Sequence, residues 1–390
     1  MDFEAHNAEV REVWEAYHAG NPIRVPMTLG INPRLTLLDP KLNVDGTTFR
    51  EYFEAPRIMW DVQLRHQHWV RHNLVHDSEM GIPDRWSVYV DFQNCYEALW
   101  FGGDLRYIAG NVPDVPPFVT DDRKWAFLDS GAPDPFGGWM ARNWEYYEQF
   151  RAFAAEAEFH GRPVDVVSPT GLGTDGPFTI GCALRGATEL CLDMYADPEF
   201  FDAFMGFITE ATIERIRAYR ERLGVPVATR TWGFADDSVA LLSVSSYRER
   251  VLPYHRRLIE AFGPDGPNSI HLCGDATHLF PTIRDELKVN AFDTGFPVDH
   301  GGLRRTLGPD VFIYGGPHVE FLRGRTPAEV REETRRILES GVMEGGKFVL
   351  REANNLAPRT PEQNLAAMYR CCLEHGNYAG QTLQAGGGSG

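Results

Sequence analysis

Two residue types that commonly bind metal lie one residue apart in the C-terminal half of the chain. His271 and Cys273 occur in SIHLCGDATHLF, where an apolar run predicts a strand at Asn268–Leu272. Residues i and i+2 of a strand point to the same side, so both side chains can reach one metal ion. Zinc accepts nitrogen and sulfur ligands and converts a bound thiol to a thiolate. The alternative is a buried histidine beside an inert thiol, because two ligands do not complete a zinc site.

An acidic pair follows the stretch TWGFA. Asp236 and Asp237 carry groups that can bind a cation, accept a proton or orient His271. Adjacent residues of a strand face opposite sides, so at most one of the two is expected to enter the site. The alternative is a solvated loop or a cap for the following helix.

A glycine-rich loop, GTDGPFTIG at residues 173–181, leads into a predicted helix. Backbone amides at such a position can bind an anionic group, so we predict Asp175 and Gly176 as cofactor-binding residues. The alternative is a loop whose glycines only serve its backbone shape.

Predicted strands alternate with predicted helices along the chain. The eight strands are expected at Arg24–Gly30, Ser87–Phe92, Val164–Ser168, Val225–Thr231, Asn268–Leu272, Val289–Asp293, Val311–Gly315 and Lys347–Arg351. Helical spacing of apolar residues is clear at Asp197–Leu223, Ser245–Phe262, Ala276–Leu287, Thr326–Ser340 and Thr360–His375. The last two begin Thr-Pro-x-Glu/Gln, which predicts a capping box at each start. This alternation predicts an α/β fold, a single (β/α)8 TIM barrel with an N-terminal helical extension, with an open doubly wound sheet as the alternative. In a barrel the chemistry lies at the C-terminal ends of the strands, where the candidate residues occur.

Composition limits the class of protein and its partners. The 390 residues carry a net charge of −17, which argues against nucleic acid as a partner. Six cysteines without regular spacing predict free thiols, and the acidic start and the lack of a long apolar run predict a cytoplasmic protein without a membrane partner. We expect one domain over residues 1–384 and a flexible tail, AGGGSG, at 385–390.

Several stretches together resemble one superfamily. GPFTIGCALRGATELCLDMYADPEFF, HLCGDATHLFPTI, LGPDVFIYGGP and GGKFVLREANNLAP are similar, in consistent order over about residues 160–378, to the uroporphyrinogen decarboxylase superfamily. The resemblance implies a single (β/α)8 barrel. One branch decarboxylates uroporphyrinogen and carries an arginine-rich motif, R-Q-A-G-R, near its first strand. The matching region here, VPMTLGINPRLTLL, contains only Arg34, so the resemblance favours the other branch, the corrinoid-dependent methyltransferases.

The methyltransferase branch binds zinc through His-x-Cys and a further cysteine after the last strand. The resemblance therefore implies zinc at His271 and Cys273, but Asn354 stands where the last cysteine is expected. The third ligand is then expected to be Glu352, Asp236 or His318. We predict Glu352 as the metal ligand and both Asp236 and Glu352 as catalytic residues.

The predicted function is a zinc-assisted, corrinoid-dependent methyltransferase, for example an O-demethylase. It would move a methyl group between a small methylated ether, amine or thiol and a corrinoid (cobalamin). The corrinoid is expected on a separate protein, because this chain lacks a D-x-H-x-x-G cobalamin-binding pattern. One alternative is a decarboxylase or lyase that acts on a tetrapyrrole or aromatic acid. Another is a binding protein that has lost its catalytic ligands.

Overall fold

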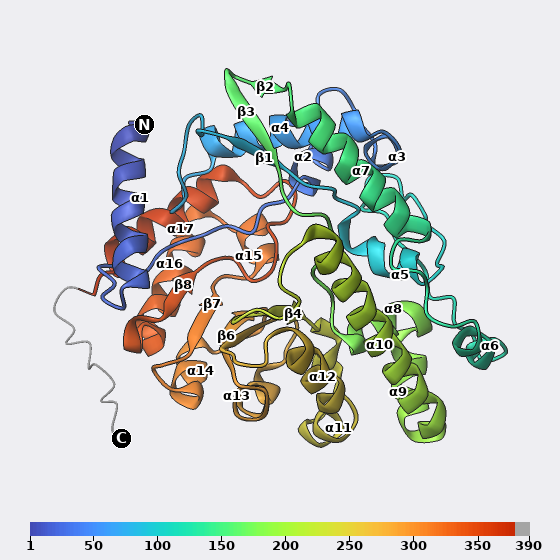
Figure 1. The fold of residues 1–390 in the computed structure, drawn as a ribbon. Coiled ribbons are helices and arrows are strands. Elements are labelled where there is room, and N and C mark those ends of the chain that lie inside the picture. Colours follow the sequence, from blue (N-terminus) through green and yellow to red (C-terminus); the bar gives the residue numbers. More distant parts are fainter. Residues whose placement is uncertain (379–390) are drawn as a thin grey trace.

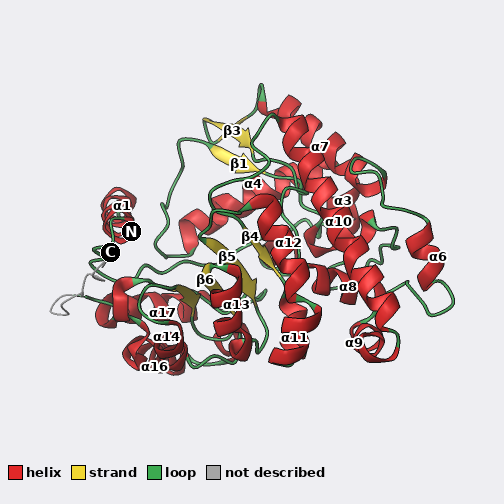
Figure 2. Ribbon diagram, turned by 60° about the horizontal axis from the view of Figure 1, so that its bottom comes forward, coloured by secondary structure: helices red, strands yellow, loops and turns green. Residues whose placement is uncertain are grey.

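The computed structural model describes residues 1–378, so the predicted tail at 385–390 lies outside the described part of the chain. A parallel sheet of five strands lies at its centre, in the order β4-β5-β6-β7-β8. Helices surround this sheet, as Figures 1 and 2 show. The strands are β4 (Gly233–Ala235), β5 (Asn268–Leu272), β6 (Val289–Thr294), β7 (Phe312–Gly315) and β8 (Phe348–Leu350). The helices that follow them are α11 (Val244–Arg250), α12 (Leu252–Phe262), α13 (Phe280–Leu287), α14 (His300–Leu307), α15 (Val319–Gly324), α16 (Pro327–Ile337) and α17 (Glu362–His375). The alternation of parallel strands and helices confirms the predicted α/β class.

The N-terminal half has a separate small sheet. Strands β1 (Trp86–Val88) and β3 (Arg162–Val166) pair in parallel, and β2 (Glu158–Phe159) pairs antiparallel with β3. In Figure 1 these three strands lie at the top of the view, apart from β4 to β8. The helices of this half are α1 (Phe3–His18), α2 (Arg34–Leu37), α3 (Phe49–Glu54), α4 (Pro56–Asn73), α5 (Tyr96–Trp100), α6 (Lys124–Asp129), α7 (Gly138–Ala154), α8 (Pro177–Arg185), α9 (Ala187–Ala196) and α10 (Pro198–Leu223). Helix α1 corresponds to the predicted N-terminal extension.

The segment predicted as the first strand, residues 24–30, forms only isolated bridges. Met27 bridges Leu350 of β8 in parallel, and the amide of Leu350 donates to the carbonyl of Pro26. On the other side of this segment no ladder to β1 occurs within residues 1–378. The closed eight-stranded barrel predicted from the sequence is therefore not shown by the described residues, and the single domain over residues 1–384 stays a prediction.

Side chains take the place of strand pairing at this gap, which we call the seam. Asp77 accepts a hydrogen bond from the amide of Met27 at 2.6 Å, and its own amide donates to the Met27 carbonyl at 2.8 Å. Across the seam, Gln63 of α4 accepts from the amide of Tyr89 at 3.0 Å and donates to the Tyr89 carbonyl at 2.6 Å. These bonds satisfy backbone groups that a neighbouring strand would otherwise bind.

The structure corrects two boundaries near the fourth strand. The predicted strand at 225–231 is wrong, and β4 lies further along the chain. The amide of Val225 donates to the carbonyl of Arg220 as part of the end of α10, and Pro226 has no amide to give to a ladder. The predicted helix at 245–262 is divided into α11 and α12 just before Pro253, because proline lacks the donor that an unbroken helix needs.

The two Thr-Pro helix starts also differ. Thr326 forms the predicted capping box with Glu329 at the start of α16. The same prediction at Thr360 is wrong, because α17 begins one residue later, after Pro361. The hydroxyl of Thr360 instead donates to the carbonyl of Ala357 at 2.7 Å, so it is not available to the helix amides.

No helix among residues 1–378 is both long enough and apolar enough to cross a membrane.

Candidate metal centre

The ends of three adjacent strands bring the candidate residues together. His271 of β5 pairs with Ala235 of β4 on one side and with Asp293 of β6 on the other. The amide of Asp236, just after β4, donates to the carbonyl of His271. Because these strands are parallel, their carboxyl ends form one edge, the edge where α/β enzymes hold their functional groups.

Asp237, His271 and Cys273 form a group of possible metal ligands. Each offers one ligand atom, and the three atoms lie within 4.8 Å of one another. The Nε2 atom of His271 is 3.7 Å from Oδ1 of Asp237, and the backbone amide of Cys273 donates to the same oxygen at 2.6 Å. All three residues are partly exposed, so an ion can reach them. Imidazole nitrogen, thiolate sulfur and carboxylate oxygen together fit zinc.

Asp293 holds His271 in the orientation that this group needs. Its Oδ2 atom lies 2.8 Å from Nδ1 of His271 and also accepts from Nη1 of Arg351 at 2.8 Å. With Nδ1 bound to this carboxylate, Nε2 is left to face Asp237. A carboxylate behind the histidine is the usual arrangement around bound zinc. Asp293 ends the strand predicted at 289–293, so its place at the carboxyl edge was predictable from the sequence, but its contact with His271 was not.

The charges of the group shift the pKa values of its members. Burial lowers the pKa of His271, but the hydrogen bond and charge of Asp293 and the charge of Asp237 outweigh it, so the pKa is raised above its usual value. Burial, followed by the negative charge of Asp237, raises the pKa of the Cys273 thiol well above its usual range. Cys273 therefore needs a cation beside it to become a thiolate.

Asp236 is not part of this group of possible metal ligands. Its carboxylate is fully buried, where Oδ1 accepts from the amide and the hydroxyl of Thr179, at 2.8 and 2.6 Å. Its Oδ2 atom contacts Nε2 of His255 at 2.7 Å and accepts from the amide of Phe178. Asp236 thus sits at the N-terminus of α8, where a negative charge is stabilised. The structure places Asp237, and not Asp236, beside His271 and Cys273.

Glu352 is not a member of the ligand group either. Its side chain is fully buried, and Oε1 accepts from the amide of Gly30 at 2.6 Å. Its Oε2 atom is buried without a hydrogen-bond partner in the described residues. Burial raises the pKa of Glu352 to about 7. Arg351 joins it to the centre, because Nη2 of Arg351 is 3.6 Å from Oε1 and Nη1 binds Asp293.

The loop with Asp175 and Gly176 reaches the same edge from the N-terminal half. Asp175 bridges Ala235 of β4, and its amide donates to Oε2 of Glu97 at 2.8 Å. Burial, and then the charges of Glu97, Asp237 and Asp236, raise the pKa of Asp175 well above its usual value. A Cβ atom at Gly176 would overlap the carboxylate of Asp236, so a glycine is needed here for close approach; its φ is negative.

Glu97 was not among the site residues predicted from the sequence. It binds the buried guanidinium of Arg215 at 2.7 Å and the hydroxyl of Thr174 at 2.6 Å. Three distant segments meet in these contacts, so no local pattern pointed to them. They hold the Asp175 loop against the end of β4.

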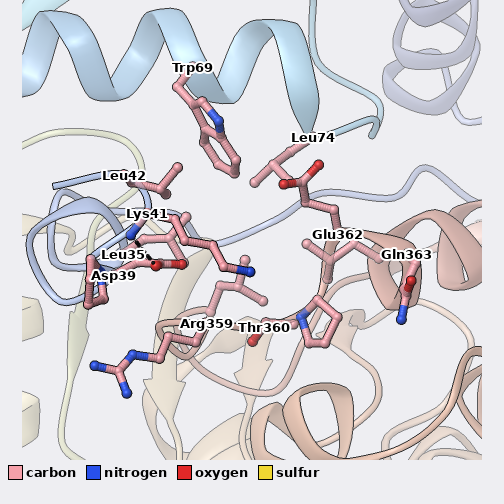
Figure 3. A pocket seen from close by; sticks show the side chains of 14 residues that line it. Leu35, Asp39, Lys41, Leu42, Trp69, Leu74, Arg359, Thr360, Glu362 and Gln363 are labelled. Carbon is pink, nitrogen blue, oxygen red and sulfur yellow. Dashed lines mark hydrogen bonds between the residues drawn. The ribbon is translucent and has the colours of Figure 1, made fainter. Parts of the chain in front are cut away.

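Two cavities differ in their relation to the centre. One of about 580 Å³ adjoins it and is lined by Gly233, Phe234, Ser269, Ile270, His271, Ala291, Asp293, Tyr314 and Arg351. Small side chains on β4, β5 and β6 leave this space open. The other, of about 810 Å³, contains none of these residues. Figure 3 shows it between Trp69 of α4 and the segment Arg359 to Gln363, with Lys41 pointing into it.

Comparison with known proteins identifies relatives of this chain. The sequence model of the family described as uroporphyrinogen decarboxylase (URO-D) matches residues 87–375. The methylated-thiol–coenzyme M methyltransferase of Methanosarcina mazei is 31% identical over 202 residues, 51% of each chain. The uroporphyrinogen decarboxylase of Pelobacter propionicus is 27% identical over 204 residues, 50% of this chain and 57% of its own. The chain thus spans about half the length of the curated relatives it matches.

A solved structure is similar in fold over most of this chain. A methyltransferase from Methanosarcina mazei superimposes with a TM-score of 0.61 at 18% identity, over 94% of this chain and 98% of its own. This likeness is evidence for the fold alone. Among the curated relatives, the methyltransferase of Methanosarcina mazei agrees with the branch that the sequence resembles.

Proposed function

Because this chain belongs to the uroporphyrinogen decarboxylase family, we propose that it is a zinc-dependent methyltransferase acting with a corrinoid. The single observation that carries the proposal is the group of Asp237, His271 and Cys273 at the carboxyl ends of β4 and β5. The similarity to a methylated-thiol–coenzyme M methyltransferase supports the reaction class. We infer a small methylated ether, amine or thiol as one substrate and a separate corrinoid protein as the partner.

The residues have distinct roles in this proposal. His271, Cys273 and Asp237 hold the metal, with Asp237 in the place that the sequence assigned to Glu352 or Asp236. Asp293 is a positioning residue, because it acts through the ring of His271. When bound, zinc supplies a Lewis acid that polarises the heteroatom carrying the methyl group. The 580 Å³ cavity beside His271 is large enough for a small substrate.

Glu352 remains a candidate for handling a proton. Its free, buried Oε2 and its pKa of about 7 allow it to be protonated or ionised near neutral pH. The buried position of Asp236 suits a role in holding α8 and β4 together. The loop at Asp175 and Gly176 borders the centre and stays a candidate for cofactor contacts.

The ligand set bears on the substrate class. A carboxylate in place of the family's last cysteine donates less negative charge to zinc than a thiolate does. Held by this set, a zinc ion would be a stronger Lewis acid, which would suit polarising the oxygen of a methyl ether better than carrying an activated thiol. This connects Asn354, at the position of the missing cysteine, with a methyl-ether substrate.

Metal analysis of purified protein tests the proposal. We expect about one zinc per chain, and less than about a tenth of that in the double variant His271→Ala/Cys273→Ala. The matched control is His160→Ala/Cys191→Ala, which removes the same residue types outside the group and should keep its zinc. Full-rate methyl transfer by chelated protein without detectable metal would overturn the mechanism.

A decarboxylase acting on a tetrapyrrole or aromatic acid is the second candidate. The similarity to uroporphyrinogen decarboxylases over 204 residues favours it. Release of carbon dioxide from uroporphyrinogen by the purified protein, unaffected by the His271→Ala/Cys273→Ala change, would select this candidate over the methyltransferase.

A further inference from the structure

A cavity of about 300 Å³ lies at the seam, where Gln63 and Asp77 replace strand pairing. Part of its wall is apolar and comes from both sides of the gap. The apolar side chains are those of Leu29, Ile31 and Pro33 after the bridge to β8, Val70 of α4, and Met80. None of the residues that line it belongs to the metal centre. Its volume is at the lower end of the range for small-molecule sites, so a ligand of about one ring fits.

Two buried histidines face this cavity. His66 is 5% exposed and His76 is 7% exposed, and both line the cavity wall. Nδ1 of His76 lies 2.8 Å from the carbonyl of Leu74, which only accepts hydrogen bonds, so Nδ1 carries the proton. Burial lowers the pKa of His76 and lowers that of His66 to about 4, so both rings are neutral. Nε2 of His76 is therefore left as an acceptor for a ligand hydroxyl.

A cation completes the lining. The Nε atom of Arg71 donates to the carbonyl of Gly81 at 2.7 Å, which fixes the side chain along the wall. Arg71 forms no salt bridge with a residue in the range 1–378, because the nearby Glu79 pairs with Arg11 at 2.6 Å. The guanidinium thus keeps donors free for a planar anion, which it binds best in a bidentate manner.

We propose that the seam cavity binds a small aromatic monocarboxylate that carries a hydroxyl group. The carboxylate pairs with Arg71, the ring packs between Val70 and Ile31, and the hydroxyl donates to Nε2 of His76. Glu79 also lines the cavity, but its carboxylate pairs with Arg11, whereas Arg71 forms no salt bridge within residues 1–378. The proposal does not depend on the metal centre or on the methyltransferase reaction.

Calorimetric titration of the full chain with 4-hydroxybenzoate, benzoate and phenol tests the proposal. We expect 4-hydroxybenzoate to bind with a Kd below about 1 mM and at least about tenfold more tightly than either of the other two. Arg71→Gln should weaken 4-hydroxybenzoate at least about tenfold. The control Arg65→Gln, on the same helix but outside the cavity lining, should leave its affinity unchanged.

His76→Phe provides an independent readout, because it should remove the preference for 4-hydroxybenzoate over benzoate while both still bind through Arg71. Circular dichroism checks that each variant folds, and Arg71→Lys replaces Arg71→Gln if that variant does not. The proposal is overturned if 4-hydroxybenzoate does not bind, if the folded Arg71 variant binds it with unaltered affinity, or if His76→Phe keeps the preference.

Discussion

Backbone groups find their hydrogen-bond partners in different ways in the sheet β4 to β8 and at the seam. From β4 to β8, each strand bonds directly to its neighbour in parallel register. At the seam, between residues 24–30 and β1, Asp77 and Gln63 bond to the backbone instead. Direct pairing fixes side chains at the strand ends, which is how His271 and Asp293 meet. Bonding by side chains leaves space between the elements, and the seam cavity occupies that space.

The largest expected effect comes from a large-to-small substitution in the core beneath the sheet β4 to β8. Phe292 of β6 is fully buried and packs on Phe280 at a ring-centroid distance of 4.9 Å. Phe292→Ala should lower the free energy of unfolding by about 3–5 kcal/mol, measured by denaturant titration. Phe296→Ala, at a 37% exposed side chain, is the control and should cost less than about 1 kcal/mol. Equal losses would show that the sheet is not the stable part of the fold.

At the seam, the corresponding change is Gln63→Met. It keeps the side-chain volume but leaves the amide and carbonyl of Tyr89 without partners, which should cost about 1–3 kcal/mol. Gln67→Met is the control, because within residues 1–378 Gln67 makes a single side-chain hydrogen bond, to the Ser87 carbonyl, at a more exposed place. Equal unfolding midpoints of the two variants would show that the bonds between Gln63 and Tyr89 do not stabilise the seam.

A smaller effect concerns how pairing positions the metal centre. Asp293→Asn keeps the shape of the side chain but removes the charge behind His271. Zinc affinity, measured by competition with a chelator, should fall about 10- to 100-fold while the fold is retained. Asp299→Asn, at an exposed carboxylate outside the centre, should leave zinc affinity unchanged. Unchanged affinity in Asp293→Asn would remove Asp293 from the centre.

The smallest effect separates two similar helix starts. Thr326→Ala removes the capping box of α16 and should cost about 1 kcal/mol in thermal or chemical unfolding. Thr360→Ala removes no helix cap and should cost less. A larger loss at Thr360 would show that its bond to Ala357 matters more than a capping box does.

Sequence patterns predicted the strands β5 to β8 well. The strand expected at 268–272 has those bounds, and β6, β7 and β8 differ from their predictions by one or two residues. Apolar runs between well-marked helices leave little choice of boundary there. The predictions failed at 24–30 and 225–231, where Pro26 and Pro226 interrupt pairing and where distant side chains or a helix end take up the backbone groups.

The sequence by itself determined the α/β class, the family resemblance, and the presence of His271 and Cys273 on one side of a strand end. All three depend on local spacing or on order along the chain. The tertiary structure decided which carboxylate joins them, because Asp236 and Asp237 are adjacent in the sequence and equally available. Asp236 instead binds Thr179 of α8 and His255 of α12, which leaves Asp237 beside the possible metal ligands. It also decided that Asp293 stands behind His271, since that contact depends on the register between β5 and β6.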